Sequence, residues 1–325
     1  MACGERQAYV MARLHTSATL LAFAAIYLIW GTTFLGISLM LRTLPAFIGG
    51  GLRFLVAGLL MWGWLRAREP RPFAGLSLPG TALCGVLLTG MGNGFLIWAQ
   101  LGLPSGIAAV FVGSLPVWIL LLDWMFFTRR APRPMSALGV LLGLAGIVVL
   151  SLHTQGPSGN VRPIYVVAVL VTELAWALGT LLQPRYTPST RVINFTCLQM
   201  LVGSGFQFLL SLVDREWAGF AVRQVSLLSW GALAYLAIVG SIIAFSSYAF
   251  LVAHVAAQKV ATYALVNPII ALALGALVLH EKVTEPAVIA MVLVLLGVAL
   301  VLGQRLPPKT GVAAAPMSAV RRARS

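Results

Sequence analysis

The sequence predicts an all-α membrane protein of ten transmembrane helices, arranged as two inverted five-helix repeats. Three observations predict this fold class: the composition, the spacing of the apolar segments, and a similarity between the two halves of the chain. Of the 325 residues, 60% are hydrophobic and 9% are charged. Soluble domains contain about 45–50% apolar and about 25% charged residues. A chain with so few charges cannot form a polar surface at this size, and the excess apolar surface must face lipid.

The positive net charge of +14 fits a membrane protein better than a nucleic-acid-binding protein. The basic residues lie in short clusters between apolar segments, where they orient a membrane chain. The cysteines Cys3, Cys84 and Cys197 show neither a disulfide framework nor metal-ligand spacing. We find no catalytic cluster and no phosphate-binding loop, so we expect no enzyme activity, no cofactor and no direct use of ATP.

Ten apolar segments are long enough to cross the hydrocarbon core, which requires about 20 helical residues. Helices are expected because in lipid each backbone N–H and C=O group must be satisfied within its own segment. The predicted spans are 18–40, 46–65, 79–101, 106–127, 135–152, 163–183, 193–213, 227–250, 256–279 and 286–303. Residues 1–17 are predicted to be a cytoplasmic N-terminal tail, and residues 304–325 a disordered basic C-terminal tail.

The distribution of basic residues predicts the orientation of the chain. Ten spans place both termini on one side, and most of the 22 Lys and Arg residues then fall on that side. The positive-inside rule therefore favours cytoplasmic termini in a bacterial-type inner membrane. In the second half of the chain this bias depends on the C-terminal tail.

An internal repeat relates the two halves of the chain. Trp30 and Trp176 are 146 residues apart, and at the same offset segment 52–56 matches segment 198–202. Pro116 and Pro268 follow at an offset of 152. Since each predicted repeat, 18–152 and 163–303, has five spans, the second is inverted relative to the first. Inverted repeats are common in secondary transporters, whose substrate site lies between the halves.

Several motifs, in order along the chain, resemble the EamA family of the drug/metabolite transporter superfamily. They are Ile29-Trp30-Gly31-Thr32-Thr33-Phe34, Gly51-Leu52-Arg53-Phe54, segment 104–110 with Pro116, Glu173-Leu174-Ala175-Trp176, and Val266-Asn267-Pro268 followed by Glu281. With Gly92-Asn93-Gly94, the chain looks most similar to the YedA-like drug/metabolite exporters. The resemblance implies export of amino acids, related metabolites or drugs. The family often has Glu after the fourth span, where this chain has Arg129.

Glu173 is the most informative candidate residue, because it lies in the middle of an apolar run. A carboxylate at bilayer depth costs about 2.5 to 3.5 kcal/mol on insertion scales. Trp176, three residues later, lies on the same helix face. We expect Glu173 to bind a proton or a substrate amine and Trp176 to stack on the substrate. The alternative is a protonated Glu173 that is hydrogen-bonded to a neighbouring helix.

Other polar and aromatic residues at bilayer depth are candidates for lining the substrate cavity: Trp30, Thr32, Thr33, Asn93, Tyr263 and Asn267. Arg53 could hold a substrate carboxylate, cap helix carbonyls, or extend outward to the interface. Pro116 and Pro268 are predicted hinges, since proline in a membrane helix frees backbone carbonyls.

The expected partners are a small-molecule substrate, the lipid bilayer and, if Glu173 couples transport to an ion gradient, protons. No nucleic acid is expected, and a homodimer is left open. Uptake or passive facilitated transport is the alternative function. A membrane enzyme or a sensor is less favoured, because no catalytic cluster and no soluble output domain are found in the sequence.

Overall fold

The computed structural model describes residues 2–129, 131–153, 155–156, 159–160, 162–255 and 260–303. Among these residues, nine helical segments are long and apolar enough to cross a membrane. A tenth apolar helix, Tyr263–Val278, has 16 residues. The predicted all-α membrane class is therefore confirmed. The ninth span is shorter than the predicted 256–279, and residues 256–259 lie outside the described part, as does the predicted tail at 304–325.

The first half of the chain forms the elements up to the short strands. They are α1 (Ala2–Met40), α2 (Ala46–Arg66), α3 (Leu78–Cys84), η1 (Gly85–Gly92), α4 (Asn93–Ala99), α5 (Ser105–Val112), α6 (Leu115–Leu122), η2 (Asp123–Thr128), α7 (Pro134–His153), β1 (Gln155–Gly156) and β2 (Gly159–Asn160). The strands β1 and β2 pair in antiparallel orientation. Because α1 begins at Ala2, helix also occupies the predicted N-terminal tail.

The second half continues with helices to the end of the described residues. They are α8 (Pro163–Tyr186), η3 (Ser189–Arg191), α9 (Val192–Val213), η4 (Glu216–Ala218), η5 (Val222–Gln224), α10 (Leu227–Tyr235), η6 (Leu236–Ile243), α11 (Ala244–His254), α13 (Tyr263–Val278) and α14 (Glu285–Leu302). Elements η1, η2 and η6 are π-helical, and η3, η4 and η5 are 3₁₀ turns.

Two spans contain a π-helical segment in their middle. Segments α3, η1 and α4 form the continuous span Leu78–Ala99, and α10, η6 and α11 form Leu227–His254. A π-helical turn leaves a backbone carbonyl free to bond a side chain, and such turns are frequent at functional sites. In η1 the Leu88 carbonyl accepts a hydrogen bond at 3.1 Å from Nδ2 of Asn93, the first residue of α4.

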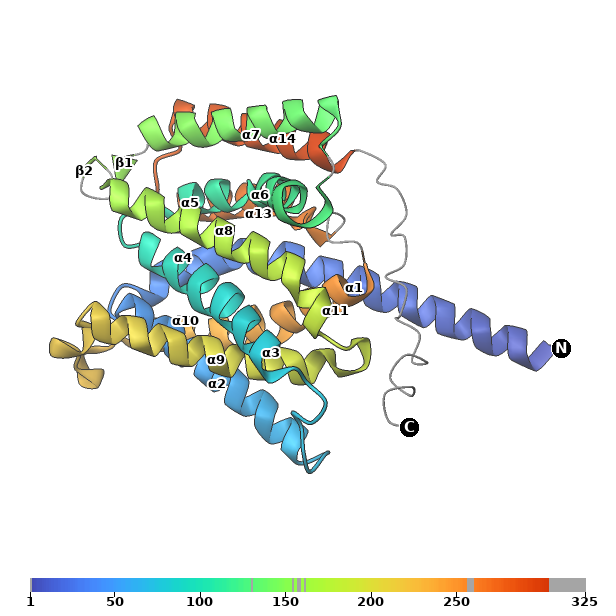
Figure 1. Cartoon of the computed structure of the whole chain (residues 1–325). Coiled ribbons are helices and arrows are strands. Elements are labelled where there is room, and N and C mark those ends of the chain that lie inside the picture. The colour runs from blue at the N-terminus through green and yellow to red at the C-terminus, as the bar shows by residue number, and fades with distance from the viewer. Residues whose placement is uncertain are drawn as a thin grey trace, which may run out of the picture.

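Helices of the two halves of the chain pack against each other through small residues. Helices α7 and α14 lie side by side at one edge of the bundle (Figure 1). A Cβ added to Gly297 would stand 2.5 Å from Gly139 O, so the two backbones touch there. Helices α2 and α9 pack in the same way, and Ser204 Oγ donates to Gly51 O at 2.9 Å. Small residues permit such close approach in membranes.

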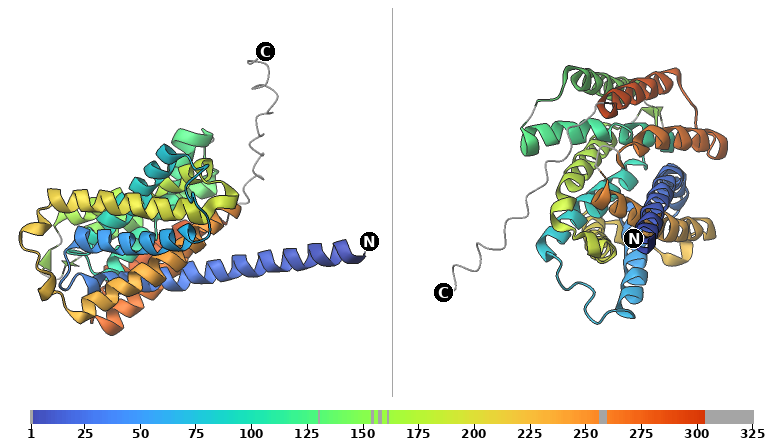
Figure 2. Two further views of the ribbon diagram at one scale, coloured as in Figure 1. Left: turned by 90° about the horizontal axis from the view of Figure 1, so that it is seen from below. Right: turned by 90° about the vertical axis from the view of Figure 1, so that its right-hand side faces the viewer.

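The bundle has two ends, which we name by the chain segments that lie there. At the termini end, α1 begins, α14 ends and α2 is followed by residues 67–77 (Figure 1). The turns at 41–45, 100–104, 214–226 and 279–284 lie at the distal end. Figure 2 shows that α1 extends beyond the other helices at the termini end.

Candidate functional site

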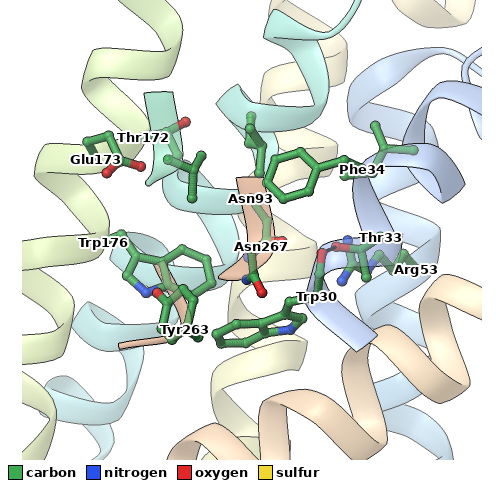
Figure 3. A pocket seen from close by; sticks show the side chains of 13 residues that line it. Trp30, Thr33, Phe34, Arg53, Asn93, Thr172, Glu173, Trp176, Tyr263 and Asn267 are labelled. Carbon is green, nitrogen blue, oxygen red and sulfur yellow. Dashed lines mark hydrogen bonds between the residues drawn. The ribbon is translucent and has the colours of Figure 1, made fainter. Parts of the chain in front are cut away.

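A cavity of about 40 Å³ lies inside the bundle, between elements of both halves. Helices α1, α2, α4 and α5 contribute from the first half, and α8 and α13 from the second. The lining residues are Trp30, Thr33, Phe34, Ile37, Arg53, Asn93, Leu96, Val112, Thr172, Glu173, Trp176, Tyr263 and Asn267. Figure 3 shows side chains of α8 on one side, Arg53 and Thr33 on the other, and Asn267 between them.

Polar atoms without a protein partner gather in the cavity wall. Glu173 is 1% exposed, and its Oε2 has no hydrogen-bond partner. Thr172 Oγ1 and Asn267 Oδ1 are likewise buried and unpartnered. Most buried polar atoms in proteins are hydrogen-bonded, and each exception calls for an explanation. Glu173 and Asn267 present acceptor oxygens to a ligand that donates hydrogen bonds, and Trp176 Nε1, which is also buried without a partner, presents one donor.

Aromatic rings enclose the same space. The ring centre of Trp30 lies 5.6 Å from that of Trp176 and 4.9 Å from that of Tyr263, both edge to face. Tyr248, whose ring centre is 5.1 Å from that of Trp30, supports the cluster from α11. Such edge-to-face contacts fix ring orientation. Trp30 and Trp176, the pair from which the repeat was predicted, therefore meet at the cavity.

Arg53 lies opposite Glu173 and is 2% exposed. Its Nε donates to Ser241 Oγ at 2.8 Å, and its Nη2 lies 3.4 Å from Gly240 O, both in the π-helical segment η6. Arg53 therefore bonds groups of a neighbouring helix, and its contact with a substrate carboxylate stays a prediction. Among the described residues, Arg53 and Glu173 form no ion pair. Arg53 also joins α2 of the first half to η6 of the second.

Thr32, unlike its neighbour Thr33, does not line the cavity. Its hydroxyl donates to Ile29 O at 2.7 Å and bonds the Tyr235 hydroxyl. It faces a separate apolar groove of about 570 Å³ between α1, α10 and α13. Consecutive residues on a helix point about 100° apart, and the orientation of α1 directs Thr33 into the cavity and Thr32 into the groove. The other predicted lining residues, and Glu173, are at the cavity.

The two predicted hinge prolines lie near the contact between α13 and the junction of α5 and α6. Pro116 is in the first turn of α6, directly after the helix is interrupted between α5 and α6. Pro268 is inside α13, and a Cβ added to Gly113 would stand 2.9 Å from its Cγ. The interruption between α5 and α6 in the first half therefore contacts Pro268 in the second half. A hinge movement there remains a prediction.

Sequence reasoning did not single out Thr172 or Tyr248. Thr172 precedes Glu173 in the sequence, and this adjacency is the signal that could have found it. Tyr248 has no such signal; its hydroxyl bonds Thr180 Oγ1 at 2.6 Å, which orients the ring toward Trp30. No group of His, Cys, Asp and Glu in the described residues is arranged to hold a metal ion.

A helical membrane bundle with a polar and aromatic cavity between its halves is an architecture typical of membrane transporters. Sequence comparison identifies the family to which the chain belongs. The model of the EamA-like transporter family matches residues 17–152 and 163–303, and the chain belongs to this family. The resemblance read from the motifs is therefore confirmed. The family and the names of relatives indicate a transporter rather than an enzyme.

Individual proteins similar to the chain carry transporter names. The chain is 31% identical over 295 residues to "Uncharacterized inner membrane transporter YedA" of Escherichia coli (strain K12), covering 90% of this chain and 94% of that protein. It is 26% identical over 284 residues to "Probable amino-acid metabolite efflux pump" of Salmonella typhimurium, covering 84% and 90%. One chain of known crystal structure matches with a TM-score of 0.61 at 21% identity, covering 95% of this chain and 99% of that one, which shows similarity of fold.

Proposed function

We propose that the protein is a secondary transporter that exports small organic metabolites bearing an amine across a bacterial-type inner membrane. The observation that carries this proposal is the group of unpartnered oxygen atoms at the cavity, Thr172 Oγ1, Glu173 Oε2 and Asn267 Oδ1. An ammonium group has three N–H donors and no acceptor, which matches two acceptor groups and a hydroxyl. The faces of Trp30 and Trp176 would attract the same cation.

The size of the cavity supports alternating access. A volume of about 40 Å³ admits a few water molecules, whereas pockets that bind small organic molecules are typically about 300–1,000 Å³. A metabolite can therefore enter only when the helices around the cavity move apart. Rocking of two halves about a fixed site is the usual means of such movement in secondary transporters.

The proposed moving halves are the two repeats, 18–152 and 163–303, inverted relative to each other. The packing of counterpart helices, α2 on α9 and α7 on α14, supports this arrangement. The π-helical segments η1 and η6, which lie in counterpart spans, support it as well. In this arrangement the tenth apolar helix, α13, completes the second set of five, and both termini lie in the cytoplasm.

Export and proton coupling are the finer parts of the proposal. Export follows the name of the Salmonella relative, a probable amino-acid metabolite efflux pump. Proton coupling follows from Glu173, because a carboxyl that releases its proton when it binds an ammonium group couples proton movement to substrate movement. Such an exchange would let the proton gradient drive the amine out of the cell.

Reconstitution into proteoliposomes tests the proposed function. Flux of amino acids and of their deaminated analogues is measured with and without a pH gradient, for the wild type, Glu173→Gln and Glu285→Gln. We expect amine flux that responds to the gradient in the wild type and in the Glu285 control, whose carboxylate is exposed at the start of α14. Glu173→Gln should lose about tenfold or more of amine flux, equal to about 1.4 kcal/mol, together with the gradient response. Unchanged flux and pH dependence in Glu173→Gln would refute the role of this carboxyl.

A further inference from the structure

The carboxylate of Glu281 joins the two halves of the chain at the distal end. Its Oε1 accepts a hydrogen bond from the backbone N–H of Ser105 at 2.7 Å, and its Oε2 one from Gly106 at 3.1 Å. These are the first two residues of α5, where N–H groups have no partner within the helix. The partial positive charge of a helix N-terminus adds to the attraction. A carboxylate of the second half therefore caps a helix of the first.

The local chain geometry aims Glu281 at α5. After α13 ends, the N–H groups of Leu279 and Glu281 both donate to Gly275 O at 3.1 Å. His280 has a φ of 55°, and this left-handed residue reverses the chain as helix C-caps do. Gly275 leaves space for the returning carboxylate, since a Cβ there would collide with Glu281 Oε2 and stand 2.9 Å from Ser105 Oγ.

The repeat counterpart of Glu281 is an arginine. At the offset of 152 it is Arg129, and at the offset of 151 it is Arg130. Arg129 has the same left-handed φ of 55° as His280, which supports the second alignment. A guanidinium has no acceptor for an N–H group, and a helix N-terminus repels its charge. The counterpart position at the termini end therefore cannot form the bond that Glu281 forms at the distal end.

Other contacts between the halves lie at both ends, and they include a bond from Tyr27 to Thr262 next to the start of α13. At the distal end, Glu216 accepts from the N–H groups of Phe47 and Ile48 at 2.9 and 2.8 Å. At the termini end, Arg191 donates to Glu69 at 2.6 Å. Both contacts join residues at an end of α2 to residues that flank α9, so these two helices are connected at both of their ends. The α5 and α13 pair has its carboxylate contact at the distal end.

We infer that Glu281 is a latch that closes the distal end of the cavity, and that no counterpart carboxylate occupies its repeat position at the termini end. The inference rests on the proposed function, because the latch controls the movement of the two halves. With the distal end latched, the cavity exchanges with the termini side in the resting protein. For an exporter with cytoplasmic termini, this is the side from which substrate loads. Release on the other side then requires the Glu281 bonds to break.

Sided cysteine labelling tests the latch without any substrate. Val112, a cavity-lining residue, is changed to Cys in a background in which the native cysteines are Ala. A membrane-impermeant maleimide is then applied to each side of the vesicles, with a terminal tag marking the termini side. Glu281→Ala removes the carboxylate, and Gly275→Ala displaces it. The matched controls are Glu285→Ala, an exposed carboxylate at the same end, and Gly205→Ala, where an added Cβ meets no atom within 4 Å.

We expect Glu281→Ala and Gly275→Ala to raise labelling from the distal side by roughly tenfold, the effect of losing charge-assisted bonds. The two controls should label as the parent does. The double variant Arg129→Glu and Arg130→Glu, which supplies the missing acceptor, should lower labelling from the termini side.

The outcomes separate the latch from the proposed transport function. Parental labelling on both sides in the Glu281 and Gly275 variants, or an equal rise on both sides, would overturn the latch even if transport is intact. If labelling from the distal side rises but the reconstituted protein transports no metabolite, the latch is supported and the proposed transport function is refuted.

Discussion

The Arg53–Ser241 bond predicts a large stability loss from the removal of one hydroxyl. Arg53 is 2% exposed and Ser241 is 0% exposed, and the Nε–Oγ distance is 2.8 Å. Ser241 Oγ in turn donates to Leu236 O at 2.9 Å. In Ser241→Ala, a guanidinium N–H and a π-helical carbonyl both lose this partner in a buried region. The bond therefore connects the two halves as well as satisfying a buried cation.

Two magnitudes bracket the cost of Ser241→Ala. Hydrogen bonds to charged groups contribute about 1.5–3 kcal/mol, whereas interhelical hydrogen bonds in membrane proteins average about 0.6 kcal/mol. We expect about 2 kcal/mol, because the donor is a cation whose other contact, with Gly240 O, is long at 3.4 Å. Equilibrium unfolding in mixed detergent micelles measures this free energy.

Ser247→Ala is the matched control for this prediction. Its hydroxyl donates to Ile243 O at 2.8 Å within one continuous span and makes no described contact between the halves. Its loss should cost less than about 0.5 kcal/mol. Equal losses for the two serine variants would refute the claim that Arg53 is a stabilising connection between the halves.

Two further predictions concern helix packing and an exposed loop. Gly297→Ala should destabilise the protein by about 1–3 kcal/mol, because its Cβ would meet Gly139 O; Gly205→Ala, with open space around it, is the control in the same unfolding assay. Burial raises the pKa of the Glu216 carboxyl, so its stability contribution is present at low pH and is lost as the pH rises through the raised value. The melting temperature of the wild type should therefore fall relative to Glu216→Gln as the pH rises above about 4.3, the usual pKa of a free Glu. A constant difference would contradict this.

The sequence predicted the features that depend on composition and periodicity. Membrane spans follow from apolar length, and nine of the helical segments reach spanning length among the described residues. The depth of Glu173 and its shared face with Trp176 follow from the 3.6-residue period of a helix. The repeat offset linked Trp30 to Trp176, which lie 5.6 Å apart at the cavity.

Features that depend on contacts between distant helices were not accessible from the sequence. Thr32 and Thr33 are equivalent in composition, and only the packing of α1 decides which of them faces the cavity. The partner of Arg53 is 188 residues away in sequence, on a π-helical turn that hydrophobic periodicity does not reveal. The role of Glu281 depends on the turn after α13, where a left-handed residue directs its carboxylate to α5.

The central claim is that the cavity between the halves is the substrate site and that Glu173 receives the substrate amine. An experimentally determined structure with a transported amine bound tests this claim most directly. We predict the ligand between Trp30 and Trp176, with its ammonium within hydrogen-bond distance of Glu173 Oε2 and Asn267 Oδ1. A ligand in the apolar groove beside Thr32, away from Glu173, would contradict the account.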